Sequence, residues 1–279
     1  MKVVRTLKEL RQVRAGYAGE VGFVPTMGAL HAGHQSLMAR ARQECAKVVV
    51  SVYVNPTQFG PGEDFTSYPR TERADLELCA SAGVDLVWLP ASEELYPEGS
   101  QTYVELERLG KLWEGASRPH HFRGVATVVC KLFHAVVPTR AYFGEKDRQQ
   151  LQVIRGMVGD LLFGLEVVGV PTAREPSGLA LSSRNSYLSA EQRARAALIW
   201  RSLEAVRRSF LAGARQASEL EAVFRESLAP LEGAQVERFD IVHADFQAAF
   251  SPEEKVERAS VCVAVRYAGV RLLDQVELP

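Results

Sequence analysis

Two histidines lie three residues apart in a glycine-containing segment near the amino terminus. His31 and His34 belong to the stretch PTMGALHAGH at residues 25–34, which also contains Gly28 and Gly33. Residues three apart on a helix point the same way, and the amino terminus of a helix offers free backbone N–H groups to an anion. Two imidazoles there can donate hydrogen bonds to phosphate oxygens while charge moves during displacement at phosphorus. The segment therefore predicts a phosphate-binding turn.

Two plainer interpretations of this histidine pair compete with phosphate binding. The same residues could form a helix cap that carries two surface histidines. The expected strand before the pair, the glycines and the expected helix after it favour a ligand site, because ligands of open parallel sheets bind at the carboxyl ends of strands. A zinc site needs further ligands at suitable spacing, and the sequence places none nearby.

Neutral amides follow the next β-rich run. Asn55 and Gln58 stand in NPTQFG, directly after the run KVVVSVYV at residues 47–54. Amide groups both donate and accept hydrogen bonds, which suits a small ligand that carries hydroxyl and carboxyl groups. Because Asn-Pro often starts a turn, a turn without a ligand is the alternative.

A third segment, residues 113–125, gathers cationic side chains before an expected helix. Arg118, His121 and Arg123 could form a rim that attracts an anion. The alternative is an ordinary basic helix entry, which uses the same residues.

A lysine marks the junction between a later expected strand and helix. Lys146 lies in FGEKDRQQL, where a phosphate-binding lysine would be placed, and Asp147 can stay ionised at the helix start. Gln150 follows one turn later on the Lys146 face. Solvated helix charges are the alternative.

The last polar segment is GLALSSRNSYL. Its Ser182, Ser183 and Arg184 combine hydroxyl donors with a permanent cation, a set that suits a polyphosphate. A simple interdomain linker is the alternative.

Strands and helices alternate through the part of the chain that carries most of these segments. The hydrophobic pattern predicts strands at 20–25, 47–54, 85–89, 141–143 and 166–170, and helices at 35–46, 71–82, 123–137 and 146–161. Such alternation predicts an α/β fold, a Rossmann-like parallel sheet with helices on both faces. We expect this domain to span residues 1–172.

The pattern changes after about residue 172. Ser189 to Gln192 has the form of a capping box, and one long helix is expected from there to about Leu211, followed by another over 217–228. β runs end the chain at 238–242, 261–267 and 270–276, and the intervening Ala268-Gly269 predicts a tight hairpin. We expect a smaller C-terminal α+β domain at 173–279.

Composition narrows the class of protein. The chain has 279 residues and a formal net charge of -1, so nothing asks for nucleic acid or an anionic membrane as partner. Four cysteines lack metal-ligand spacing and are expected as buried free thiols. No signal-peptide core or bilayer-spanning run is visible, which indicates a cytoplasmic protein.

The segments together resemble a known family. HAGH resembles the His-x-Gly-His signature of the nucleotidyltransferase superfamily, and the longer PTMGALHAGH resembles the pantothenate synthetase family within it. NPTQFG, GASRPHHFRGV, GEKDRQQ and the Ser-Ser-Arg-Asn run are similar to further stretches of that family. The resemblance covers nearly all of residues 1–190 and is mostly architectural beyond.

The resemblance implies a reaction. It implies an ATP-dependent, AMP-forming condensation of pantoate with beta-alanine through a pantoyl adenylate, with Mg2+ bound mostly by ATP and water and with a homodimeric enzyme. The second domain would close over the ATP site. Catalytic roles fall on His34 and Lys146, with His31 assisting.

The implied site residues fall into four groups. The ATP-binding group comprises Met27, Gly28, His31, His34, Gly144, Lys146, Asp147, Ser182, Ser183 and Arg184. The pantoate-binding group comprises Pro25, Thr26, Met27, Asn55, Gln58 and Gln150. Arg118 and His121 form the loop rim, and Asp75 is the candidate metal ligand.

The chain departs from the family pattern at three places. His120 stands where relatives commonly have glycine, and Ser177 precedes Gly178 where they usually have aspartate. Of the consecutive aspartates that relatives often carry near residues 71–75, this chain keeps Asp75.

Other functions stay open at this point. The nearest is another nucleotidyltransferase that acts on a small cofactor precursor. A non-catalytic nucleotide sensor would need the phosphate turn but not the amides. A tRNA synthetase is disfavoured, because the chain is short and has no basic excess.

Overall fold

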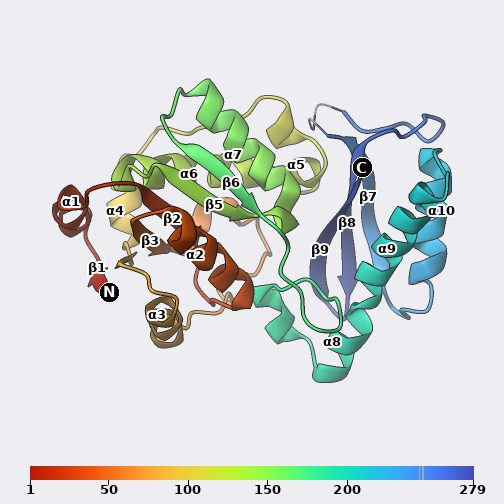
Figure 1. The fold of residues 1–279 in the computed structure, drawn as a ribbon, viewed down its shortest axis with the longest axis horizontal. Helices are drawn as coiled ribbons and strands as arrows, with labels where there is room; N and C mark the ends of the chain where they lie inside the picture. Colours follow the sequence, from red (N-terminus) through yellow and green to blue (C-terminus); the bar gives the residue numbers. More distant parts are fainter. Residues whose placement is uncertain (245, 247) are drawn as a thin grey trace. The chain divides into compact units, whose positions relative to one another are not determined.

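The computed structural model of the protein describes residues 1–244, 246 and 248–279. This part of the chain divides into two compact units, whose elements are labelled in Figure 1. The first unit comprises Met1–Glu145 and Gln149–Pro171, and the second comprises Lys146–Arg148 and Thr172–Pro279. Within the described ranges, no helix combines the length and apolar character needed to cross a membrane.

The first unit is built on a parallel sheet of six strands. They are β1 (Lys2–Val4), β2 (Val21–Thr26), β3 (Lys47–Val52), β4 (Leu86–Trp88), β5 (Arg140–Gly144) and β6 (Glu166–Val170). Their spatial order is β1-β4-β3-β2-β5-β6, and every pairing is parallel. The strands from β2 onward thus follow the doubly wound order 3-2-1-4-5. The predicted Rossmann-like class is confirmed.

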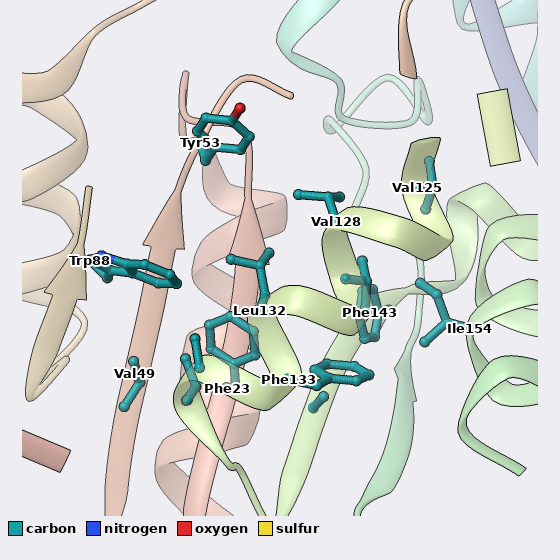
Figure 2. Close-up of a cluster of buried hydrophobic side chains, with 14 of the residues drawn as sticks. Phe23, Val49, Tyr53, Trp88, Val125, Val128, Leu132, Phe133, Phe143 and Ile154 are labelled. Carbon is teal, nitrogen blue, oxygen red and sulfur yellow. The ribbon is translucent and has the colours of Figure 1, made fainter. Parts of the chain in front are cut away.

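Helices cover both faces of this sheet, because successive strand residues point to opposite sides. Phe23 and Phe143 join a core with α1 (Leu7–Ala15), α6 (His121–Val136) and α7 (Arg148–Asp160), whereas their neighbours Val24 and Tyr142 join a core with α2 (Ala32–Glu44) and α3 (Glu72–Ser81). Figure 2 shows the first core, where α6 side chains such as Leu132 and Phe133 lie over the strands. A buried face on each side explains the nearly continuous apolar strands.

The strand order fixes where a ligand can bind. In such a sheet the order reverses between the first and fourth strands, which here are β2 and β5. In folds of this kind the loops after these two strands run to opposite faces, and ligands bind at the carboxyl ends of the strands there. The histidine turn follows β2 directly, and residue 146 lies two positions beyond the end of β5.

Most expected elements of this unit are present, with shifts of a few residues at their ends. Two elements at the amino terminus, β1 and α1, were not predicted from the sequence, although Thr6 and Glu9 form a reciprocal capping box that starts α1. Two four-residue helices, α4 (Ser92–Leu95) and α5 (Glu114–Ser117), were not predicted either. Short 3-10 turns lie at η1 (Pro56–Gln58), η2 (Leu109–Lys111) and η3 (Glu145–Asp147).

The second unit packs helices against an antiparallel sheet. Its elements are η4 (Ser183–Tyr187), α8 (Ala190–Ala196), α9 (Leu198–Leu211), α10 (Ala217–Leu228), β7 (Gln235–His243), β8 (Ala259–Tyr267) and β9 (Val270–Leu278). Apolar residues of α9, α10 and the three strands form one core. Ala268 and Gly269 both have positive φ (48° and 78°), as the tight hairpin between β8 and β9 requires.

The expected long helix is wrong in one respect. The capping box of Ser189 and Gln192 is present, but the helix is interrupted at Ala197, so that α8 and α9 replace one continuous element. No glycine or proline marks the break, and the sequence gives no signal for it. All four cysteines are free, as expected; Cys45 and Cys79 are buried, and the other two are half-buried.

Candidate active site

The histidine turn joins β2 to α2. His31 is the N-cap residue of α2, and its Nδ1 accepts a hydrogen bond from Gly33 N at 3.1 Å. The Nδ1 of His34 accepts one from His31 N at 3.3 Å, and the two ring centroids lie 4.2 Å apart. The two side chains predicted to act together therefore lie side by side at a helix amino terminus.

The same hydrogen bonds fix the tautomers of the two rings. A nitrogen that accepts a backbone N–H carries no hydrogen, so neutral His31 and His34 carry theirs on Nε2. Each ring is then a donor at Nε2, which is the polarity that a phosphate oxygen requires.

The backbone of this turn is held by a buried carboxylate. Gly28 and Ala29 both have positive φ (82° and 49°), and the next N–H groups point at Asp75. Its oxygens accept from Ala29 N at 3.1 Å and Leu30 N at 2.8 Å, and also from the Thr71 hydroxyl at 3.1 Å. A Cβ on Gly28 would lie 2.9 Å from Asp75 Oδ2, so glycine is needed there for space as well as for φ.

These contacts give Asp75 a structural role, which bears on the metal ligation expected of it. Its side chain is buried, and both carboxylate oxygens already accept a backbone N–H. Magnesium prefers several waters and exposed oxygen ligands. Among the residues that the structure describes, no group of three or more His, Cys, Asp or Glu could hold a metal ion. The geometry favours a brace for the turn, and metal ligation by Asp75 stays an untested prediction.

The amides that follow β3 form a connected platform. Gln58 Oε1 accepts from Asn55 Nδ2 at 3.1 Å, and Gln58 Nε2 donates to Met27 Sδ at 3.1 Å. A thioether is a weak acceptor, so an incoming oxygen can replace it readily. Met27 is the residue before Gly28, and the platform thus adjoins the histidine turn directly.

Asn55 is the scaffold of this platform. Its Nδ2 also donates to Gly124 O, and its Oδ1 accepts from Thr57 and from the Tyr96 hydroxyl at 3.0 Å. The side chain is buried. All of these bonds are internal, so Asn55 supports Gln58.

Two predicted pantoate contacts lie at the end of β2. The Thr26 hydroxyl donates to Ser51 O at 2.8 Å and accepts from Gly28 N at 3.2 Å, so it ties β2 to β3 and to the turn. Pro25 is half-buried one position earlier. A contact of either residue with pantoate stays a prediction.

Arg118 and His121, the residues of the predicted rim, lie together in a cluster with two carboxylates. Arg118 donates to both carboxylate oxygens of Glu63, at 2.7 and 2.5 Å, and lies 3.5 Å from a Glu114 oxygen. Its charge is therefore already compensated by carboxylates, and its side chain is only 16% exposed. These contacts favour the alternative of an internal cluster, and the anion-attracting rim stays an untested prediction. Arg123 lies apart from the cluster, with its guanidinium 4.7 Å from the Tyr103 ring centroid.

The cluster also sets the protonation of its members. Burial lowers the pKa of His121 to about 4, and the adjacent Arg118 charge acts in the same direction. Burial alone would raise the pKa of Glu63, but the hydrogen bonds and charge of Arg118 outweigh it and hold that pKa below its usual value. At neutral pH the cluster therefore contains a neutral imidazole and an ionised carboxylate.

Lys146 stands in η3, after Gly144 ends β5. Its Nζ lies 3.7 Å from Asp147 Oδ2, and its side chain is 21% exposed. Gln150 follows in the first turn of α7 and is half-buried. The sequence analysis missed Gln149, which is buried and donates to Leu109 O and Leu112 O while it accepts from Glu114 N. The one sequence signal for Gln149 is that it directly precedes Gln150, a predicted pantoate-binding residue.

The serine segment lies in the second unit. Ser182 caps η4 by accepting from Arg184 N at 3.3 Å, and Ser183, like these two, is half-buried. Asn185 is buried and donates to Ala180 O. The structure thus places the three predicted residues on one short turn.

The two loop departures have structural accounts. His120 has φ +71°, a conformation that suits glycine, the residue that the family pattern led us to expect there. The turn around Gly178 is held without the usual aspartate, since Arg174 Nη1 donates to Gly178 O at 3.1 Å and the same guanidinium makes two bonds to Asp274.

Comparison with known proteins identifies the family. The model of the family described as pantoate-beta-alanine ligase matches residues 2–277. The pantothenate synthetase of Chloroflexus aurantiacus is 51% identical over 276 residues, which cover 98% of this chain and 97% of the relative.

Solved structures agree with this match. The pantothenate synthetase of Thermus thermophilus is 50% identical, with a TM-score of 0.93 and coverage of 100% and 99% of the two chains. The pantoate-beta-alanine ligase of Francisella tularensis, complexed with beta-gamma ATP and beta-alanine, is 33% identical, with a TM-score of 0.81 and coverage of 99% and 97%. Among the functions that the sequence left open, the ligase is the one supported, and the chain belongs to the pantoate-beta-alanine ligase family.

Proposed function

We propose that this enzyme condenses pantoate with beta-alanine in an ATP-dependent, AMP-forming reaction that passes through a pantoyl adenylate. One observation carries the proposal. Met27 Sδ accepts a hydrogen bond from the Gln58 side-chain amide, and Met27 directly precedes the turn that carries His31 and His34. A group suited to a hydroxy acid thus adjoins a group suited to phosphate, as transfer between the two requires.

In the first step, a pantoate carboxylate oxygen attacks the α-phosphorus of ATP. The new O–P bond forms as the bond to pyrophosphate breaks. The Nε2–H groups of His31 and His34 neutralise charge that develops on the phosphate oxygens, and Lys146 adds a positive charge. Ser182, Ser183 and Arg184 hold the triphosphate, together with the backbone near Gly28, Gly144 and Asp147.

In the second step, the beta-alanine amine attacks the carbonyl of the adenylate. The C–N bond forms, AMP leaves with the carboxyl oxygen, and the nitrogen loses its proton. Gln58 and Gln150 hold pantoate throughout, and Asn55 fixes Gln58. The mixed anhydride hydrolyses readily, so the site must also exclude water.

The assignment of ATP and beta-alanine as substrates is inferred from a relative. The Francisella tularensis ligase was solved with beta-gamma ATP and beta-alanine, and it covers nearly the whole chain. Magnesium enters the proposal as part of the ATP substrate, held by phosphate and water. We also propose a homodimer in the cytoplasm, with residues 1–172 binding nucleotide and pantoate and residues 173–279 completing the ATP site.

The direct test is incubation of the protein with ATP, pantoate and beta-alanine. We expect one AMP, one pyrophosphate and one pantothenate per turnover, resolved by liquid chromatography. Omission of beta-alanine should leave enzyme-bound pantoyl adenylate and pyrophosphate. AMP transfer to a phosphorylated precursor, without amide formation, would refute the proposal.

The Lys146→Ala variant tests the first step. Loss of one charge donor at a developing oxyanion costs on the order of a hundredfold in rate. We therefore expect single-turnover formation of pantoyl adenylate to slow by about that factor. A near-wild-type rate would remove Lys146 from the mechanism.

A further inference from the structure

The backbone carbonyl oxygen of Gln58 accepts hydrogen bonds from two side chains of the cluster at the start of α6. His121 Nδ1 lies 2.8 Å from this oxygen, and Arg118 Nη2 donates to it at 3.3 Å. In the proposed function, Gln58 binds pantoate. The contacts that fix its backbone therefore bear on how accurately its amide is placed.

The protonation of His121 follows from its neighbours. Arg118 Nη1 lies 3.1 Å from His121 Nε2, and a guanidinium can only donate. His121 Nε2 must then accept, so the hydrogen of the neutral ring is on Nδ1, where it donates to Gln58 O. The donors run in one direction, from Arg118 through His121 to Gln58. This tautomer is opposite to that of His31 and His34.

Two carboxylates hold the Arg118 guanidinium in place, and this fixes the direction of the hydrogen bonds from Arg118 through His121 to Gln58. Glu63 receives two hydrogen bonds from Arg118, and Glu114 lies on its other side. Burial and the Arg118 charge keep His121 neutral, since its pKa lies near 4. The imidazole thus stays a donor at Nδ1 and an acceptor at Nε2 across the neutral range.

Close packing holds the same residue from another side. A Cβ on Gly124 would lie 2.3 Å from Thr57 O and 2.7 Å from Gln58 N, so the backbones of α6 and η1 touch there. Asn55 bridges the same two elements through Gly124 O and Gln58 Oε1. The backbone and the side-chain amide of Gln58 are therefore both held in position relative to the start of α6.

We propose that His121, fixed by Arg118 as the Nδ1–H tautomer, is a positioning residue that sets the place of the Gln58 amide for pantoate. The inference rests on the proposed function. It goes beyond it because His121 would touch neither substrate. A displaced Gln58 backbone should weaken pantoate binding while the histidine turn, and with it ATP binding, keeps its own supports.

Two substitutions separate the two nitrogens of the ring. In His121→Asn, the Asn amide nitrogen takes the place of Nδ1 and keeps the donor to Gln58 O. In His121→Gln, the longer amide reaches the place of Nε2, so the contact with Arg118 is kept and the donor to Gln58 is lost. We expect His121→Gln to raise the KM for pantoate roughly tenfold, because the Gln58 carbonyl loses its shorter hydrogen bond and keeps only the longer one from Arg118. His121→Asn should stay within about threefold of wild type.

The control is His134→Gln on the same helix. His134 is exposed and contacts the Phe163 ring, away from Gln58, so all its kinetic constants should be unchanged. The KM for ATP should change less than about twofold in every variant, a split that general loss of folding would not produce. Thermal unfolding of each variant checks that the protein is folded.

A spectroscopic measurement tests the tautomer without turnover. Nitrogen-15 labelling of the histidines should show His121 with its hydrogen on Nδ1 and no protonation between pH 8 and pH 5. An Nε2–H ring, or an unchanged KM for pantoate in a folded His121→Gln variant, would overturn the inference. Wild-type protein that makes no pantothenate would instead refute the proposed function, so the two failures are distinguishable.

Discussion

The histidine turn and the Arg118–His121 cluster contain similar side chains but use them differently. In the turn, backbone N–H groups occupy Nδ1 of His31 and His34, and the rings keep Nε2–H as a donor. In the cluster, protein groups occupy both nitrogens of His121, and two carboxylates compensate Arg118. The first arrangement suits an external anion, whereas the second supplies its anions internally.

This difference shows why residue type alone overstates a site. A basic side chain at a helix start does not by itself mark an anion site, because carboxylates of the fold can compensate its charge, as Glu63 and Glu114 do for Arg118. Glu63 stands 55 positions before Arg118 in the chain, so the sequence analysis had no reason to pair them. The following experiments test this comparison, from the largest expected effect to the smallest.

Removal of the Arg118 charge should affect stability first. Arg118→Met leaves the buried Glu114 and the half-buried Glu63 without their cation, which costs about 3 kcal/mol of unfolding free energy. Urea titration measures it. The control Arg123→Met loses only a partly exposed contact with Tyr103 and should cost less than about 1 kcal/mol. Equal losses would mean that the cluster is not structural.

His34→Ala should show the opposite behaviour. Loss of one donor to the developing phosphate charge should slow adenylation about a hundredfold, equivalent to about 2.7 kcal/mol. The unfolding free energy should fall by about 1 kcal/mol, the cost typical of losing a helix-cap hydrogen bond. Single-turnover kinetics and urea titration on the same sample give both values. A large loss of stability with normal chemistry would reverse the comparison.

The cluster should make stability depend on pH. The pKa of His121 is lowered from 6.5 to about 4, so between these values the unfolded state binds a proton that the folded state does not. Stability must then rise with pH in this window and fall on acidification, by about 2.5 kcal/mol from pH 7.5 to 4.5. The charged groups that face His121 are Arg118, Glu114 and Glu63. The difference between wild type and His121→Gln, measured by urea titration at each pH, isolates the histidine; parallel curves would contradict the assignment.

The smallest expected effect lies at His120, inside the segment that carries the Arg118–His121 cluster. His120 holds φ +71° without an N-cap hydrogen bond from its side chain. His120→Gly removes this strain, and we expect a gain of about 0.5–1 kcal/mol in unfolding free energy. Differential scanning calorimetry at pH 7.5 measures it. A loss of stability would show that the imidazole makes a contact that outweighs the strain.

The sequence was sufficient for the elements whose signals are local. The apolar run before Asn55, the capping box at Ser189 and the Ala268-Gly269 turn each predicted an element that is present. The amino-terminal β1 and α1 were missed, because a three-residue edge strand carries little pattern and α1 buries only Leu10.

The candidate site likewise has parts that local sequence signals predict and parts that they do not. Segments that follow β2, β3 and β5 could be placed at one edge of the sheet from their order alone. The partners of Asp75 and Arg118 could not, because a hydrogen bond between distant segments leaves no periodic signal. Those partners decide whether a polar side chain faces a ligand or supports a loop.

The pairing of β2 with β5 has a consequence for how the chain is made. Val21 and Thr139, at the start of this pairing, are 118 positions apart. During synthesis β2 and β3 can associate early, but one edge of β2 must wait for more than a hundred further residues. Until then it is an open apolar edge exposed to other nascent chains. The strand pair that carries the candidate site is therefore also one that leaves an unpaired edge during synthesis.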